Sequence, residues 1–197
     1  MSEQVEQSRA DATRARLMAA AVEAFAAKGF HGTTTRDIAT AAGMSPAALY
    51  VHHRSKEELL HLISRAGHEA TLALVVEGRA SSESPVEQLC RVMHDFAEHH
   101  AERHTAARVV NYELAALSPE HHAGIMELRR TIDAEMQALV EAGVAAGVFD
   151  VPDPRIASAA LLSLGIDIAR WYDERAGWTP RRVAEHYVTI ALRIVGA

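Results

Sequence analysis

Side chains that could contact nucleic acid are concentrated in one short stretch near the amino-terminal end of the chain. Ala47 and Ala48 are small enough to let a helix lie deep in a major groove, where an alanine methyl can contact a thymine methyl. His52 can donate a hydrogen bond to a base or a phosphate. Tyr50 and Lys56 suit phosphate oxygens. These residue types predict a DNA-binding surface.

Two very short helices are needed to position these side chains. The sequence predicts them at residues 35–42 and 46–52, joined by a glycine-containing turn at 43–45, and this length and spacing is typical of a helix-turn-helix. Ile38 and Leu49 give the two helices a shared apolar face. The second helix is thereby free to present its outer face to DNA.

The rest of the chain is predicted to be helical as well. Five of the six prolines follow Ser, Asp or Thr, a pairing that marks helix starts, because the polar side chain caps a free N–H and proline fits the first turn. Apolar residues recur with helical spacing, and no stretch alternates for long enough to suggest a strand. We expect an all-α fold of about nine helices, at residues 9–28, 35–42, 46–52, 56–77, 85–101, 103–117, 119–146, 154–175 and 180–195.

The charge distribution predicts two parts with different partners. The 197 residues carry a net charge of −6, from 20 basic and 26 acidic side chains. Residues 1–60 hold seven of each, so the whole acidic excess falls in residues 61–197.

Cys90 is the only cysteine, and the polar amino terminus lacks the basic patch and apolar run of a signal peptide. We therefore expect a cytoplasmic protein with no membrane partner.

Residues 9–60 resemble the amino-terminal domain of the TetR family of transcriptional repressors. The family pattern is an apolar helix ending in Phe-x-x-x-Gly, a Thr pair, Ile-Ala-x-x-Ala-Gly-x-Ser, Leu-Tyr-x-His and Ser-Lys-Glu-x-Leu. His53 departs from the Phe that often follows the histidine, so we expect altered packing beneath the recognition helix. The matching residues are Phe25 to Gly29, Thr34 and Thr35, Ile38 to Ser45, Leu49 to His52, and Ser55 to Leu59.

The resemblance implies a homodimer whose paired recognition helices enter successive major grooves of a palindromic operator. It also implies a flexible segment 1–8, a helix-turn-helix domain 9–60, and a ligand-binding and dimerisation domain 61–197. Carried over to matching positions, the resemblance implies that Thr34 contacts a phosphate, as Tyr50 and Lys56 do. It also implies that Arg36 contacts base edges. The full set of residues expected at DNA is Thr34, Thr35, Arg36, Ser45, Ala47, Ala48, Tyr50, His52 and Lys56.

The last two helices are expected to pair with their copies across a two-fold axis. Small residues on the helix 154–175 allow close approach, and the helix 180–195 carries a matching apolar stripe. The alternative is that these side chains pack within their own chain. The expected interface residues are Ala157, Ala160, Leu161, Leu164, Tyr187, Ile190 and Ile194.

The resemblance also implies a small-molecule effector. A short carboxy-terminal stretch, residues 169–187, is loosely similar to TetR-like regulators of acyl-CoA catabolism, which favours an acyl-CoA or another hydrophobic compound. Such a ligand would need an apolar tunnel, with Arg170 as a cation for phosphates and Trp171 as a stacking face. Asp167 instead favours a cationic or hydroxylated molecule. The expected ligand residues are Met93, Phe96, Tyr112, Met126, Leu164, Asp167, Arg170 and Trp171.

Two further functions compete with this hypothesis. Twelve histidines, with His100 and His104 one helical turn apart, are compatible with a metal-responsive regulator, although zincin spacing is absent. A helical enzyme is disfavoured, because the sequence contains no nucleophile–base set, metal motif or phosphate-cradling glycine loop. We expect no catalytic residue, no cofactor and no resident metal.

Overall fold

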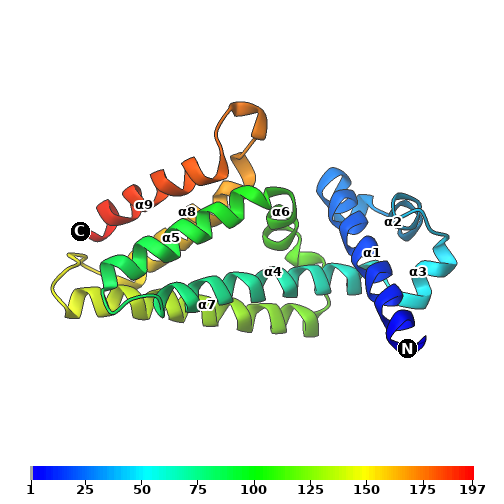
Figure 1. Ribbon diagram of the computed structural model, residues 1–197, viewed down its shortest axis with the longest axis horizontal. Coiled ribbons are helices and arrows are strands. Elements are labelled where there is room, and N and C mark those ends of the chain that lie inside the picture. The colour runs from blue at the N-terminus through cyan, green and yellow to red at the C-terminus, as the bar shows by residue number, and fades with distance from the viewer. Residues whose placement is uncertain (1) are drawn as a thin grey trace.

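A computed structural model describes residues 2–197, with side chains from residue 10 onward (Figure 1). Over these residues every regular element is helical, which confirms the all-α prediction. Two short 3₁₀ helices follow α6 and α8, at Leu114–Ala116 and Glu174–Ala176. The α-helices of the described residues are α1 (Ser2–Gly32), α2 (Thr35–Ala41), α3 (Pro46–His52), α4 (Lys56–Arg79), α5 (Pro85–Glu102), α6 (His104–Tyr112), α7 (Pro119–Ala145), α8 (Pro154–Trp171) and α9 (Pro180–Val195).

Helices α1 to α3 form a small bundle at one end of the molecule (Figure 1). Helices α4 and α7 both begin beside this bundle and run away from it, and α5, α8 and α9 complete the larger part. Helix α9 packs mainly along α5, and α8 packs against α5, α6 and α7. Helix α4 thus connects the small bundle directly to the larger part.

Helix starts lie at the predicted caps. In each case a side-chain oxygen accepts a hydrogen bond from a backbone N–H in the first turn, which satisfies a donor that the helix itself leaves free. The caps are Thr34, Ser45, Ser55, Ser84, Ser118, Asp153 and Thr179.

Four helix boundaries differ clearly from the sequence prediction, and one of them is the end of α1, which lies at Gly32 instead of residue 28. The backbone of α1 is already helical at Ser2, within the segment 1–8 that was expected to be flexible, and Met1 lies outside the described residues. Helix α6 ends at Tyr112 and α8 ends at Trp171, several residues earlier than expected. The residues beyond these ends, Leu117 and Tyr172, are buried, and an extended backbone at each directs its side chain into the core. Tertiary packing therefore overrides local helix propensity there.

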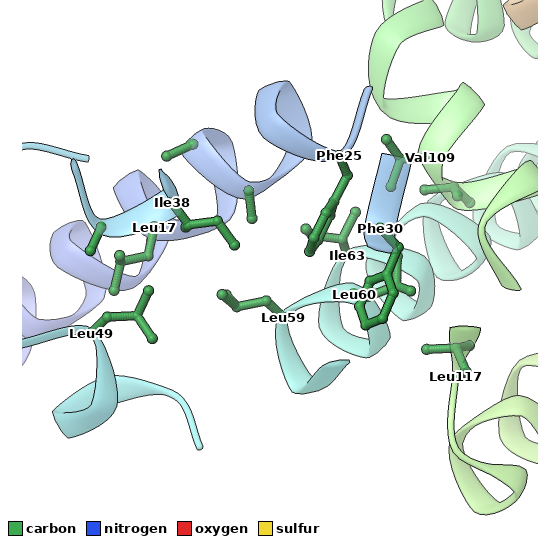
Figure 2. Close-up of a cluster of buried hydrophobic side chains, with 14 of the residues drawn as sticks. Leu17, Phe25, Phe30, Ile38, Leu49, Leu59, Leu60, Ile63, Val109 and Leu117 are labelled. Carbon is green, nitrogen blue, oxygen red and sulfur yellow. The ribbon is translucent and has the colours of Figure 1, made fainter. Parts of the chain in front are cut away.

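The hydrophobic core of the small bundle continues into the larger part (Figure 2). Leu17, Ile38 and Leu49 hold α1, α2 and α3 together, and the same cluster includes Val109 of α6 and Ile125 of α7. A second cluster fills the space between α4, α5, α7, α8 and α9. The small bundle therefore shares its core with residues of α6 and α7, and α1 packs directly against α6.

Candidate DNA-binding surface and ligand cavity

The start of α2 is fixed by a capping box. The Thr34 hydroxyl accepts from the Asp37 N–H at 3.1 Å, and the Asp37 carboxylate accepts from the Thr34 N–H at 2.9 Å. The Asp37 carboxylate accepts from the Thr34 hydroxyl at 2.6 Å, and this bond, with the bond from the Thr34 N–H and a smaller contribution from Lys28 at 3.2 Å, lowers the pKa of Asp37 to about 2. Thr34 is exposed and could still reach a phosphate, but its side chain already serves as the cap of α2.

Helix α3 presents a small, apolar outer surface. Ser45 caps it by accepting from the Ala48 N–H at 3.2 Å, and Leu49 faces the core. Ala47 is exposed and Val51 is 80% exposed, whereas Ala48 is half-buried. His52 is also half-buried, and Arg36 on α2 is exposed. The side chains expected at base edges therefore reach solvent, and the apolar ones suit thymine methyl groups.

Tyr50 connects the two short helices. Its side chain is more than half exposed, and its hydroxyl lies 3.2 Å from the Thr35 hydroxyl at the start of α2. The pair forms a polar patch at the positive end of that helix, and backbone N–H groups at a helix start favour an anion. This arrangement is compatible with the predicted phosphate contacts of Tyr50 and Thr35.

Lys56 has a structural contact that sequence reasoning missed. Its ammonium donates to the carbonyl oxygens of Phe30 at 2.7 Å and Thr33 at 2.8 Å, and it lies 4.2 Å from the centre of the Phe30 ring. The Phe30 carbonyl also accepts from the Thr33 N–H at 3.3 Å, in the turn that follows the non-helical backbone of Gly29. A phosphate would therefore compete with two hydrogen bonds that the ammonium already makes.

His53 lies buried beneath α3, where altered packing was expected. Its side chain is only 3% exposed, and neither ring nitrogen has a hydrogen-bond partner. Burial lowers the pKa of His53, with smaller contributions from neighbouring charges. An unpaired buried polar group costs stability, so this residue weakens the DNA-binding bundle.

We expect His53→Phe to stabilise the protein by about 1–2 kcal/mol, because phenylalanine fills the site without unpaired polar atoms. Urea unfolding at pH 7 measures the change. Since the pKa of His53 is depressed in the fold, its neutral form is favoured, and the wild-type chain loses stability as the pH falls below the unfolded value of about 6.5. The gain from His53→Phe should therefore be larger at pH 5.5 than at pH 8. An equal or smaller gain at pH 5.5 would contradict this explanation.

The main cavity of the described part has a volume of about 540 Å³ and lies among α1 and α4 to α8. Such a volume falls in the range of small-molecule sites. Its wall is mainly apolar, and small side chains on α4, including Ala66, Gly67 and Ala70, leave the space open. Met18 and Val22 of α1 also line it, so the cavity extends to the DNA-binding bundle.

Only Phe96 of the predicted ligand residues lines this cavity. The expectation that the predicted set shares one pocket is therefore wrong. Helix α8 faces the cavity with Leu162 and Ile166, and a residue two positions further along a helix points to the opposite side. Leu164 consequently lies on another face. Met93 is buried in the core, and Met126 is half-buried outside the cavity wall.

The polar residues expected to bind ligand lie on the outside of α8. Asp167 accepts two hydrogen bonds from Arg170, at 2.7 and 2.9 Å, which lower the pKa of the carboxyl. Trp171 stacks on Tyr187 with ring centres 6.4 Å apart. Arg170 and Tyr112 line a second, smaller cavity of about 230 Å³ beside the end of α1. None of the four reaches the main cavity.

Sequence reasoning missed the polar groups that do line the main cavity. His68, Asn111 and Arg129 come from three different helices, and His99 and Arg103 lie at the end of α5. A partial signal was present, because small residues recur one turn apart on α4 and indicate a helix face with space beside it. Which polar residues face that space depends on how the helices cross, and this cannot be deduced from one helix alone.

The outer faces of α8 and α9 carry exposed apolar side chains. Ile156 is 68% and Ile190 is 39% exposed. Two of the predicted interface residues are wrong, since Leu161 is 0% exposed and Ala157 is also buried, both on the inner face of α8. The remaining predicted residues reach the surface at least in part; they are Ala160, Leu164, Tyr187, Ile190 and Ile194.

Histidines do not converge on a metal site in the described residues, where no group of three or more potential ligands has suitable geometry. His100 is buried against Phe96, and the His104 ring lies instead against the Ala101 carbonyl. His61 and His121 stack with ring centres 3.8 Å apart, and His121 bonds Glu57 at 2.8 Å.

Helices of the described part are too short or too polar to cross a membrane.

Two family models match the chain. Residues 17–63 match the model of bacterial regulatory proteins of the tetR family. Residues 82–195, more than half of the chain, match the tetracyclin repressor-like carboxy-terminal domain. The chain belongs to the TetR family. As a TetR-family protein it is a helix-turn-helix transcriptional regulator, and its family consists of regulators rather than enzymes.

Similar proteins support this assignment over nine-tenths or more of the chain. A TetR-family regulatory protein of known structure from Rhodococcus RHA1 is 42% identical, with a TM-score of 0.87 over 93% of this chain and 96% of its own. PfmR, a TetR-family regulator from Thermus thermophilus, is 31% identical, with a TM-score of 0.84 over 90% and 97%. The transcriptional repressor KstR2 from Rhodococcus jostii is 29% identical over 185 residues, 91% of this chain and 89% of KstR2.

Proposed function

We propose that this TetR-family protein is a cytoplasmic repressor that binds a palindromic operator as a homodimer and releases it when an apolar or acyl-type ligand enters the main cavity. One observation carries the ligand response: the cavity wall includes Met18, Ala19 and Val22 of α1, the helix that supports the helix-turn-helix. A ligand in the cavity therefore contacts the DNA-binding bundle and the dimerisation part at the same time.

The coupling follows from the packing. Helix α1 is held between the cavity and the core that also contains Ile38 and Leu49. A ligand that fits better when α1 is displaced shifts the population toward that arrangement, and only such a difference in affinity can move the equilibrium. The two recognition helices then no longer match successive grooves about 34 Å apart. Repression as the output is supported by the similarity to KstR2, which is itself a transcriptional repressor.

Dimerisation is proposed to use the outer faces of α8 and α9. The exposed side chains of Ile156 and Ile190 would be covered by the partner, together with Leu164, Tyr187 and Ile194. A two-fold contact of this kind is self-complementary, because each patch meets its own copy. Without the buried Leu161 and Ala157, the outer face of α8 presents Ile156, Ala160 and Leu164, followed by the Asp167–Arg170 pair and Trp171.

Selection of binding sites from a randomised duplex pool tests the proposal. The enriched sequences are then titrated against the full-length protein by fluorescence anisotropy at near-physiological salt. We expect a palindrome whose half-sites are about one helical turn, or a small multiple of it, apart. Enrichment of single half-sites would contradict binding as a dimer, and no enrichment across a range of salt would contradict operator binding.

Tyr50→Phe should weaken binding to all duplexes to a similar extent, by roughly 3- to 10-fold, because it removes a phosphate-facing hydroxyl and no base contact. Arg36→Ala should instead change the preferred base at one position of each half-site. Competition titrations with the selected palindrome and single-base variants separate the two effects. A change of base preference in Tyr50→Phe, with unchanged general affinity, would contradict these assigned roles.

A further inference from the structure

A connected set of polar side chains lies at the wall of the main cavity. His68 of α4, Asn111 of α6 and Arg129 of α7 contribute to it. Arg129 donates to the Asn111 amide oxygen at 3.3 Å and lies 3.5 Å from His68 Nε2. Three helices therefore meet at one guanidinium in a cavity whose remaining surface is mainly apolar.

Hydrogen-bond directions in this set are fixed by backbone carbonyls. The Ser64 carbonyl can only accept, so His68 Nδ1 carries the proton and its Nε2 is an acceptor that faces Arg129. Asn111 donates its amide N–H to the Ala107 carbonyl at 2.9 Å, which turns its oxygen toward Arg129. Both partners of the guanidinium are therefore neutral acceptors that hold it in place without neutralising it.

The charge of Arg129 has no partner of opposite sign in the described part. Its contacts are to His68 and Asn111, and it makes no ion pair with a carboxylate there. Asp133, one helical turn further along α7, lines the same cavity and makes no ion pair with Arg129. Only one guanidinium nitrogen is used in the two contacts, and a guanidinium has five N–H donors. The remaining donors match the two oxygens of a carboxylate.

His100 adds an acceptor at another point of the cavity. Its Nδ1 donates to the Phe96 carbonyl at 2.8 Å, so Nε2 keeps its lone pair. Burial lowers the pKa of His100 to about 4, and the ring is therefore neutral at physiological pH. The ring packs against Phe96 with centres 4.3 Å apart, which fixes its orientation. A hydroxyl or amide N–H of a ligand is the complementary group.

We propose that the effector is an apolar carboxylate whose carboxylate group binds Arg129, with a hydroxyl or amide donor directed to His100. This inference rests on the proposed function, because it identifies the ligand class for the same cavity. A phosphate would need more positive charge than one fixed arginine supplies, since the other arginine of the wall, Arg103, is exposed. An amine would place a second cation beside Arg129, and Asp133, the carboxylate of the wall, is exposed, so it is not a fixed partner for an amine.

Calorimetric titration of the full-length protein with matched probes tests the ligand class. The probes are dodecanoate, 12-hydroxydodecanoate, dodecan-1-ol, dodecylamine and dodecanoyl-CoA, all below their micelle concentrations. We expect dodecanoate to bind roughly 10- to 100-fold more tightly than the alcohol, and the hydroxy acid to bind at least as tightly. Equal affinity for acid and alcohol, or tighter binding of the amine or of the CoA thioester, would overturn the inference. So would the absence of carboxylate binding up to ~1 mM.

Arg129→Met and Arg130→Met form a matched pair of variants for the same titrations. Arg130 is the next residue of α7, is exposed and pairs with Glu127 outside the cavity. Arg129→Met should abolish the preference for the acid, Arg129→Lys should retain most of it, and Arg130→Met should leave it unchanged. A preference that survives Arg129→Met in a protein with wild-type circular dichroism would overturn the assigned role.

Operator anisotropy in the same samples separates this inference from the proposed function. Carboxylate binding that depends on Arg129 but does not release the operator would overturn ligand release and leave the ligand class intact. Release by a probe that binds equally well to Arg129→Met would support ligand release and overturn the carboxylate assignment.

Discussion

Ile190→Asp should abolish dimerisation and weaken operator binding roughly 100-fold or more, because a monomer loses the advantage of two linked half-site contacts. Ile190 is exposed on the outer face of α9, where nothing in its own chain covers it fully. In the proposed dimer its side chain is buried against the partner, so the substitution places a charge in an apolar contact. Sedimentation velocity measures the oligomeric state, and anisotropy with the selected palindrome measures the affinity.

Val76→Asp is the matched control for this experiment. Val76 is also an exposed aliphatic residue on a helix, but it lies on α4, outside the proposed interface. We expect a dimer with wild-type operator affinity. If Ile190→Asp remains a dimer, or if Val76→Asp dissociates equally, the assignment of the interface to α8 and α9 is wrong.

Gly165→Ala should destabilise the protein by about 3 kcal/mol, because it forces atoms together at the crossing of α8 and α5. A Cβ at this glycine would lie 2.2 Å from Cε1 of the Phe96 ring, far below van der Waals contact. Phe96 is buried and its ring packs against the buried His100 ring, so a shift of Phe96 away from the new Cβ breaks existing contacts. Thermal and urea unfolding measure the loss, and ligand titration measures the accompanying change in the cavity.

Two further variants test the physical cause. Phe96→Leu combined with Gly165→Ala should recover part of the lost stability, because the smaller side chain removes the clash, and the cycle of single and double variants measures the coupling. Gly124→Ala on α7 is the control. Nothing lies within 4 Å of its Cβ position, so alanine should raise stability by up to about 1 kcal/mol through helix propensity. Additive effects of Gly165→Ala and Phe96→Leu would show that the clash is not the cause.

The helix-turn-helix domain could be predicted from the sequence, because the caps and apolar patterns that define its helices depend on residues close together in the chain. Thr34 and Ser45 cap helices through hydrogen bonds to residues three positions away, and such bonds depend only on neighbouring residues. The apolar periodicity that identifies Ile38 and Leu49 as core is equally local. Lys56 is the exception, since its partners Phe30 and Thr33 lie more than 20 positions away in the sequence.

The sequence by itself determined the fold class, the capped helix starts, the helix-turn-helix and the family. The tertiary structure decided where α6 and α8 end, that Leu161 faces inward, and that the main cavity is lined by His68, Asn111 and Arg129 instead of Asp167 and Arg170. The physical reason is the rotation of about 100° per helical residue, which makes the facing side chains depend on helix register and crossing. Register and crossing are set by packing between distant parts of the chain.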